Sequence, residues 1–579
     1  MRLLALFFAV LLLLSAAPCA LAGEKGQSPS AELTRRLGNG INLGNTFEAC
    51  DPARRSLNRD PGVYETLWGQ PRTTRAILLG MKEAGFGTLR IPVAWMTNAA
   101  DLLRRDYTLS SAYLDRVAQV TDWALDAGMT VIINDHWDGG WYGMFGSEDP
   151  DTRAFALEAY TGMWRQIAAR FASYGDRLIF EGANEELGAR FDENSVFCED
   201  STDTLLPDDE RYALTNRVNQ AFVDTVRACG GNNADRFLLI PGYGTDIDRT
   251  CDSRFIMPRD SAEGRLLISV HYYSPWSYCG ASAASGATAW GIRADLEQMR
   301  ETLSKMTRFT AAGYGVVIGE YGALPGSDGV MKDNAVLYHR AFLDCCDLFG
   351  FASCLWDTSG FYVRSRLAFS DAEMGELYRS RAERLSPEQA EESFLSLRSA
   401  APERFDSAAV LPDENGSVAW IMFSSGDWLL SYSVGDTYAP DTKSPGLIAE
   451  DAVITGPGTY TVSLDFTKTP RGCSAGVAFA ALGIANGEKL YPGYTVKLTR
   501  CLINGEETVF TGCPYTSSDD GLCTRVNLYN AWVSSVDPRA VRFPPTADPF
   551  ALTPTPLDPA APGMTKLKTL CLEFEYGPR

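Results

Sequence analysis

The stretch LIFEGANEELG, from Leu178 to Gly188, joins a short apolar run to a cluster of carboxylates. The opening Leu-Ile-Phe has the continuous apolar character of a strand that is buried on both faces, as in a parallel sheet. Glu181, Glu185 and Glu186 follow within a few residues. This pattern predicts a buried parallel strand whose carboxyl end carries polar chemistry.

Apolar runs of the same kind recur along the first part of the chain, with amphipathic helical patterns between them. The predicted strands are 39–43, 88–93, 131–134, 178–182, 237–241, 267–271, 316–319 and 353–356. The helical patterns are 73–84, 114–127, 155–171, 211–228, 294–310 and 334–349. These units predict an α/β fold, a (β/α)8 TIM barrel. An open doubly wound sheet uses the same units, but no Gly-rich phosphate-binding loop follows the first strand.

A chain of 579 residues is too long for a single core. From about Ala408 the pattern becomes all-β, with apolar residues alternating from Tyr460 to Phe466 and a hairpin signal at Asn504-Gly505. We predict a barrel over 23–380, a helical connector over 381–407 and an all-β sandwich domain over 408–579.

The termini and the charge indicate where the protein works. Residues 1–22 are typical of a secretory signal, with Arg2, an apolar run and a small-residue cleavage site at Ala20-Leu21-Ala22. Cys19 leaves a lipid anchor as an alternative. The net charge of −21 without a basic patch argues against nucleic acid and anionic membranes as partners. We therefore expect a secreted monomer.

The sequence contains 14 cysteines, which is many for a cytosolic protein and usual for an exported one, so disulfides are expected. Loss of Cys19 with the signal would leave an odd number, and at least one thiol would then be free or paired between chains. The spacings match no zinc site, and we expect neither a metal nor a cofactor.

Polar and aromatic residues follow most of the predicted strands, at the end of a barrel where functional residues gather. They are Arg90, inside the second strand, and, at or just after the strand ends, Asn45, His136, Trp137, Asn184, Glu185, His271, Tyr273, Glu320 and Trp356. Each alone is more typical of a structural role, but together they converge on one rim. Two carboxylates across a barrel mouth suit glycoside hydrolysis, in which one carboxyl group is protonated and the other ionised.

Several separated stretches carry a family resemblance. They are GNGINLGNTFEA, GFGTLRIPVAW, TVIINDHWD, LIFEGANE, SVHYYSP, VVIGEYGA and SCLWD. In this order they resemble glycoside hydrolase family 5, of the retaining endo-β-1,4-glucanase (cellulase) type, over about residues 35–360. Many members carry a His-His pair on the third strand, whereas here Trp137 follows His136.

The resemblance implies a role for each residue. Glu185 would be the general acid/base and Glu320 the nucleophile, with Arg90 hydrogen-bonded to the nucleophile. The implied substrate-binding residues are Asn45, Arg90, His136, Trp137, Asn184, His271, Tyr273 and Trp356. We expect retention by double displacement, with the two carboxyl groups about 5–5.5 Å apart.

Environment should separate the acidic residues. The pKa of Glu185 is expected to be raised and that of Glu320 to be lowered by Arg90. Glu181 lies within its strand and is expected to have a structural partner inside the barrel. Glu186 is expected to be a charge in a loop or at a helix start.

The implied substrate is β-1,4-linked glucan, namely cellulose, mixed-linkage glucan or xyloglucan. An endo-β-mannanase or xylanase on the same scaffold, and a non-catalytic glycan-binding barrel, remain alternatives. A serine esterase is disfavoured because no G-x-S-x-G motif is present. The second domain can bind glycan through aromatic residues, or these can be core. The candidates are Trp420, Trp428, Trp532, Tyr491 and Tyr494.

Overall fold

The computed structural model describes most of the chain. The described residues are 28–52, 60–198, 206–281, 290–326, 329–402, 417–425, 431–432, 446–469, 477–491, 493–508, 516–517, 524–530, 541–543, 557 and 567–578. The predicted signal, residues 1–22, lies outside them. The chain divides into two compact units, Met1–Glu403 and Arg404–Arg579. None of the helices that the structure describes is both long and apolar enough to cross a bilayer.

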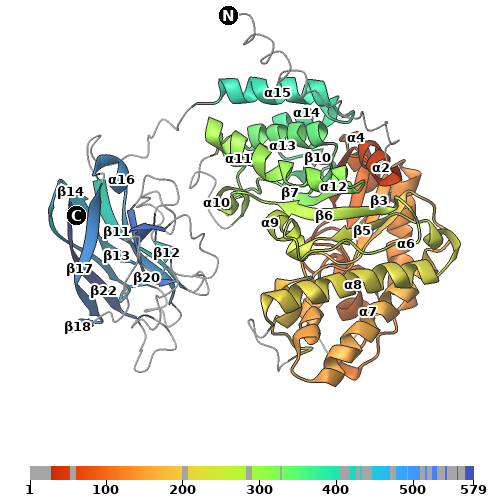
Figure 1. Cartoon of the computed structure of the whole chain (residues 1–579), viewed down its shortest axis with the longest axis horizontal. Helices are drawn as coiled ribbons and strands as arrows, with labels where there is room; N and C mark the ends of the chain where they lie inside the picture. Colours follow the sequence, from red (N-terminus) through yellow and green to blue (C-terminus); the bar gives the residue numbers. More distant parts are fainter. Residues whose placement is uncertain are drawn as a thin grey trace, which may run out of the picture. The chain divides into compact units, whose positions relative to one another are not determined.

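The first unit contains a closed parallel barrel, which confirms the predicted (β/α)8 fold (Figure 1). Its strands run in sequence order around the barrel, and β8 pairs with β1. They are β1 (Asn39–Asn42), β2 (Thr88–Ile91), β3 (Thr130–Asn134), β4 (Leu178–Glu181), β5 (Leu238–Pro241), β6 (Leu266–Tyr272), β7 (Gly315–Tyr321) and β8 (Ala352–Leu355).

Helices surround the barrel where the amphipathic patterns predicted them, except that the pattern over 294–310 forms two helices, and Figure 1 shows α7 and α8 side by side. They are α4 (Arg75–Glu83), α6 (Ser111–Asp126), α7 (Pro150–Arg170), α8 (Asp208–Ala228), α11 (Arg293–Ser304), α12 (Thr307–Ala311) and α13 (Ala335–Phe349). Shorter helices lie in the connections: α2 (Pro29–Arg36), α3 (Gly62–Glu65), α5 (Trp95–Ala99), η2 (Asp138–Gly146), η3 (Ala189–Asp192), α9 (Ile247–Thr250) and α10 (Trp276–Cys279). Gly85 and Gly128, both at positive φ, end α4 and α6 as expected for C-caps.

The barrel interior has two chemically different layers because alternate residues of a strand point to the same face. Leu33 and Leu37, from α2 and the residue after it, close the amino end. They join an apolar layer of Ile132, Ile179, Phe237, Leu239, Leu267, Val317, Ala352 and Cys354. Two residues beyond Ile179 on β4, Glu181 enters a buried polar layer with Asn42, Arg90 and Ser269.

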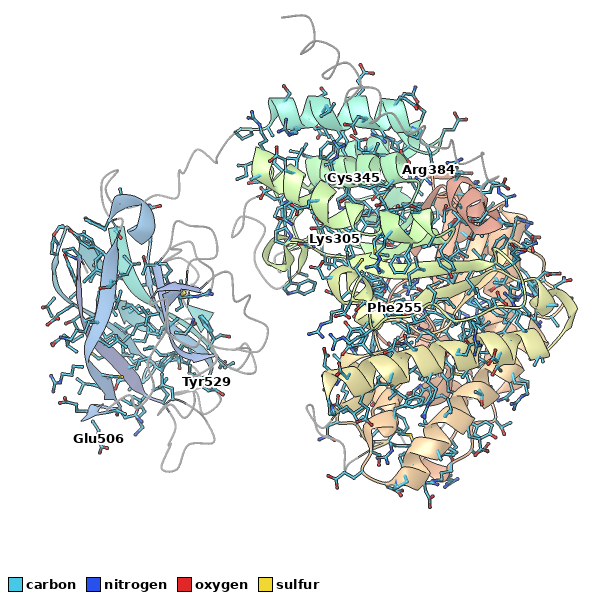
Figure 2. All side chains as sticks on the ribbon, in the orientation of Figure 1. Phe255, Lys305, Cys345, Arg384, Glu506 and Tyr529 are labelled. Atoms are coloured by element: carbon cyan, nitrogen blue, oxygen red, sulfur yellow. The ribbon has the colours of Figure 1, made fainter. Side chains whose placement is uncertain are left out.

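Two helices follow the barrel, α14 (Ala372–Ser380) and α15 (Pro387–Ala400). Arg384, labelled in Figure 2, lies between them and donates from Nε to Asp347 Oδ1 of α13 at 2.6 Å. Arg300 of α11 pairs with Glu391 of α15 at 2.9 Å. These contacts dock α15 against the helices of the barrel.

The second unit is a β-sandwich, as predicted, with two antiparallel sheets around one apolar core. One sheet contains β11 (Ser417–Ser425), β12 (Ser431–Tyr432), β14 (Ala452–Ile454), β16 (Val477–Ile484), β19 (Thr516–Ser517), β20 (Thr524–Asn530) and β21 (Val541–Phe543). The other contains β13 (Ile448–Glu450), β15 (Gly458–Asp465), β17 (Tyr494–Ile503), β18 (Glu506–Glu507) and β22 (Thr569–Pro578). Asn504-Gly505, both at positive φ, form the predicted hairpin turn between β17 and β18.

The cysteines of the described residues provide no support for the expected disulfides. Free thiols are found at Cys50, Cys229, Cys251, Cys279, Cys345, Cys346, Cys354, Cys501 and Cys571. Several of them, such as Cys345 on α13 (Figure 2), are buried and serve as small apolar side chains.

Candidate active site

Arg90 of β2 lies at the centre of the polar layer and is fully buried. Its Nε donates to Glu181 at 2.7 Å, and its Nη2 donates to Asn184 Oδ1 at 2.7 Å. Its Nη1 donates to both Asn42 Oδ1 and Glu320 Oε1 at 2.9 Å. The predicted bond from Arg90 to Glu320 is therefore present, and one planar cation fixes side chains from β1, β4, β7 and the loop after β4.

Glu181 has the structural partners that its position in the strand predicted. One carboxylate oxygen accepts from Arg90, and the other accepts from Ser269 Oγ at 2.6 Å. Since both oxygens are occupied inside the barrel, Glu181 is a counter-charge for Arg90 rather than a group that meets substrate.

Glu320, near the carboxyl end of β7, is aimed into the barrel mouth by neighbours on three sides. Besides Arg90 at Oε1, the hydroxyl of Tyr273 donates to Oε2 at 3.1 Å. His136 Nε2 lies 3.9 Å from Oε1. Burial lowers the pKa of His136 well below its usual range, with Arg90 adding to this, so His136 stands beside Glu320 as a neutral ring.

Glu185 lies just beyond β4 and is the more open of the two carboxylates, with 32% of its side chain exposed. Its Oε1 is 2.8 Å from His271 Nδ1, and its Oε2 is 3.5 Å from Arg190 of η3. The register of β6 and β7 places His271 opposite Glu320, so His271 lies between the two carboxylates.

The two carboxylates are close together. One oxygen of Glu185, one of Glu320 and a ring nitrogen of His271 all lie within 4.8 Å of one another. Retaining glycosidases have carboxyl groups about 5–5.5 Å apart, whereas inverting enzymes keep theirs about 6.5–9.5 Å apart to admit a water molecule, so this close approach of oxygens favours the retaining arrangement. Among the described residues, these three form the group of side chains whose atoms lie close enough together to hold a metal ion. The guanidinium of Arg90 on Glu320 would repel a second cation there.

The predicted pKa shifts of the two carboxyls are wrong in direction. Burial raises the pKa of Glu320, and His271 and Arg90 do not cancel the rise. Burial also acts on Glu185, but the hydrogen bond and charge of His271, with Arg190, outweigh it and lower its pKa. The pKa of His271 is raised against the effect of burial by Glu320 and Glu185.

Aromatic rings line one side of the mouth. The rings of His136 and Trp356 are stacked, with centroids 5.5 Å apart and planes 9° apart. Trp137 lies next to the half-exposed Trp68, with ring centroids 6.1 Å apart. The sequence analysis missed Trp68, because it lies in a loop with no periodic pattern.

Another aromatic ring lies beside Tyr273. Trp276 of α10 is 61% exposed and packs edge-to-face on Tyr273 at 5.9 Å. Trp276 follows Tyr273 closely in the chain, but a single tryptophan carries no signal that separates a cleft wall from a core.

Asn45 sits in a left-handed turn after β1, at φ 56°. Buried Glu48 accepts from the backbone N–H groups of Asn45 and Thr46, the latter at 2.9 Å. Burial raises the pKa of Glu48 to about 7, despite these bonds. Asparagine is one of the few residues that adopt this conformation readily, and Glu48 fixes the turn that presents Asn45.

Glu186 lies in a loop, as predicted, but it is buried, which the sequence did not indicate. It is 1% exposed, and its two oxygens accept from the backbone N–H of Trp137 at 2.5 Å and of Asn184 at 2.6 Å. The dipeptide Glu185-Glu186 thus divides between the open mouth and the interior. No periodicity in a loop could have told them apart.

The chain is similar to known proteins of one family. Residues 55–361 match the model of the family described as cellulase (glycosyl hydrolase family 5). Endoglucanase A of Paenibacillus barcinonensis is 33% identical over 361 residues, 58% of this chain and 84% of that protein. The xyloglucan-specific endo-beta-1,4-glucanase of Bacteroides ovatus is 37% identical over 308 residues, 51% of this chain and 56% of that protein.

A solved structure is similar over the same part of the chain. It is a family 5 lichenase from Caldicellulosiruptor sp. F32, a mutant in complex with cellotetraose. It aligns with a TM-score of 0.53 and 30% sequence identity, covering 61% of this chain and 95% of the lichenase chain.

Proposed function

The chain belongs to glycosyl hydrolase family 5, and we propose that it is an endo-β-1,4-glucanase that works by double displacement with retention. The observation that carries the proposal is the approach of Glu185, His271 and Glu320 to within 4.8 Å. A barrel that only bound glycan would need neither a buried carboxylate held by an arginine nor a second one paired with a histidine.

The proposed first step forms a bond between Glu320 and the anomeric carbon while the glycosidic C–O bond breaks. Arg90 and Tyr273, which already hydrogen-bond Glu320, hold one of its oxygens each and aim the group. The leaving oxygen takes a proton from Glu185. In the second step Glu185 removes a proton from water, and the water oxygen displaces Glu320 from the sugar.

Glu185 must acquire its proton before the first step, because its pKa is lowered in the free protein. The source that fits is His271, whose Nδ1 lies 2.8 Å from Glu185 Oε1. Glu185 is more exposed than His271, so substrate in the mouth removes water mainly from Glu185. The loss of water favours the neutral, protonated form of Glu185. The proton then passes from imidazolium to carboxylate along the existing hydrogen bond.

The substrate class we propose is β-1,4-linked glucan, with mixed-linkage glucan and xyloglucan included. The names of the relatives, endoglucanase, xyloglucan-specific glucanase and lichenase, support this range. The aromatic rings of Trp356, Trp137 and Trp68 along one side suit stacking on successive sugar rings.

A substrate panel tests the proposal. The protein is incubated with soluble cellulose derivative, mixed-linkage glucan, xyloglucan, mannan and xylan, and new reducing ends are counted, with Glu320→Gln as the blank. We expect release from the glucans with a rapid fall in viscosity, as internal cleavage requires. Release from mannan or xylan alone would replace the substrate class, and none on any polymer would overturn the activity.

Glycan binding by the second unit stays a prediction. Trp420 is fully buried in the sandwich core, and Trp428 and Trp532 lie outside the described residues. Tyr491 and Tyr494, half-buried and 5.1 Å apart, are the remaining candidates. If they bind, replacing both by alanine in the full chain reduces retention on insoluble cellulose; unchanged retention would remove them from consideration.

Export also stays a proposal, based on residues 1–22. Expression of the full chain in a bacterial host should yield extracytoplasmic protein whose amino terminus lies near Gly23. Protein that stays in the cytoplasm with an intact terminus would contradict it.

A further inference from the structure

Glu186 joins two loops of the barrel mouth that are distant in sequence. Its Oε1 accepts from the backbone N–H of Trp137, after β3, and its Oε2 accepts from that of Asn184, after β4. Asn184 in turn accepts from Arg90, and Trp137 follows His136. A single buried carboxylate therefore connects the acid/base side of the site with the side lined by His136 and Trp137.

The loop at one end of this connection has an unfavourable backbone. Trp137, Asp138, Gly139 and Gly140 all have positive φ. Such a run, which includes a tryptophan and an aspartate, persists only when its surroundings fix it. Asp138 is fixed by the N–H groups of Met96 and Thr97, whereas the Trp137 N–H is fixed by Glu186.

We propose that Glu186 is a positioning residue for hydrolysis, which holds Trp137 and Asn184 at the spacing that a β-glucan chain requires between the cleaved bond and the aromatic wall. This inference rests on the proposed function. It concerns an orientation set through the backbone, so Glu186 itself does not touch substrate.

The geometry makes the connection depend on ionisation. Each oxygen of Glu186 accepts one N–H, and protonation would turn one of them into a donor facing a donor. Burial raises the pKa of Glu186 to about 7, opposed by Arg190 and by the two backbone donors. The other titratable groups facing Glu186 are Asp135 after β3, Tyr142 of η2 and Tyr160 of α7.

The first experiment compares the wild type with Glu186→Gln from pH 5.5 to 8.5 on soluble mixed-linkage glucan. Glutamine keeps the shape but has one acceptor, so it reproduces the protonated state. We expect kcat/KM of the variant to be lower by about 10- to 100-fold at pH 8.5, because misplacement of substrate is costly. The ratio of wild-type kcat/KM to variant kcat/KM should fall towards one as the pH falls below 7, because Glu186 of the wild type is then protonated as well. Titration of Glu185, His271 and Glu320 affects both proteins equally and cancels in the ratio.

A second experiment reads the same connection without activity. Hydrogen–deuterium exchange followed by mass spectrometry should show faster exchange in Glu186→Gln in both segments, 135–142 and 183–187. Asp260→Asn serves as the matched control, because Asp260 is a carboxylate with a buried side chain that pairs with Arg227 and accepts the Ala262 N–H far from the mouth. It should lower stability and leave both segments and the pH-dependent ratio unchanged.

The outcomes separate this inference from the proposed function. A ratio that stays near one, or that is the same at every pH, overturns the positioning role while hydrolysis stands. A wild type inactive on every glucan overturns the proposed function, and the exchange experiment then still decides whether Glu186 ties the two loops. Unchanged exchange in both segments would overturn the connection itself.

Discussion

The two layers inside the barrel use the same strands for opposite purposes. Ile179 and Glu181 lie two residues apart on one face of β4, but the first packs among Leu239, Leu267 and Val317, and the second pairs with Arg90. The apolar layer around Ile179, here called the lower layer, stabilises the fold by removing apolar surface from water. The polar layer around Arg90 and Glu181, here called the upper layer, buries charge, and this costs free energy unless every charged group is paired. Residues that stabilise the fold and residues that form the site are thus only two positions apart on the same face of a strand.

The upper layer meets this requirement by sharing partners. Arg90 satisfies two carboxylates and two amide oxygens, and Ser269 completes Glu181. The carboxylates that fix the loops, Glu48 and Glu186, each accept two backbone N–H groups. Loss of one charged partner in this layer leaves another charge buried and unpaired, whereas an apolar layer loses stability in small steps.

The largest effect is expected at Glu320. Glu320→Gln keeps a planar side chain for Arg90 and Tyr273 to bond but removes the nucleophile. We expect kcat to fall by about 10⁴-fold or more, with cellotetraose still bound. Initial rates and tryptophan fluorescence titration measure the two quantities. A variant with wild-type turnover would place the nucleophile elsewhere.

Replacement of Arg90, the cation that several groups share, should cause the largest loss of stability. Arg90→Met leaves Glu181 buried without its counter-charge, and breaking such a pair costs about 3–5 kcal/mol. Urea unfolding of the full chain, with the barrel transition followed separately, measures the loss. A cost below that of an ordinary core truncation would mean that the upper layer is not the tightly paired network described.

Glu48, which fixes the turn after β1, should make the free energy of unfolding depend on pH. Its pKa is about 7 in the folded chain against an ordinary 4.5, so the folded state binds the proton more tightly. Stability from this group is therefore complete below about pH 4.5 and lost as pH rises to about 7, by about 3 kcal/mol in all. The difference in unfolding free energy between pH 5 and pH 8 should be smaller in Glu48→Gln. The same difference in both proteins would contradict the shift.

The lower layer should show the smallest effect. Ile179→Val removes one methylene group and is expected to cost about 0.5–1.5 kcal/mol. Because the substitution lies below Glu181, kcat should not change. Parallel urea curves and glucan assays check both halves, and a marked drop in kcat would show that the layers are coupled rather than separate.

The sequence was sufficient for the architecture because the strands are continuous apolar runs and several helices end in glycine. It also predicted a partner for Glu181, since a carboxylate inside a buried strand must have one. It failed for Glu186 and for the pKa values of Glu185 and Glu320. Those depend on which side chains from other strands reach the group and on how much water remains, and neither is encoded within a local stretch.

The same reasoning explains which site residues were found. Strand ends identify Glu185, Glu320 and His271, because a barrel brings all such ends together. Arg190 lies in the short helix η3, and Trp68 lies in a loop that is held by contacts with another loop, such as Gln70 Nε2 to Thr358 O at 2.9 Å. Nothing in a local pattern predicts those contacts.

The central claim is that Glu320 becomes covalently attached to the sugar. The most direct test is incubation with a 2-deoxy-2-fluoro-β-cellobiosyl fluoride, which slows the second step, followed by mass spectrometry of the protein and its peptides. The account predicts the mass of one fluorinated cellobiosyl group on the peptide that carries Glu320, and its loss when a glucan acceptor is added. Glucan hydrolysis without any adduct, or an adduct on Glu185, would contradict it.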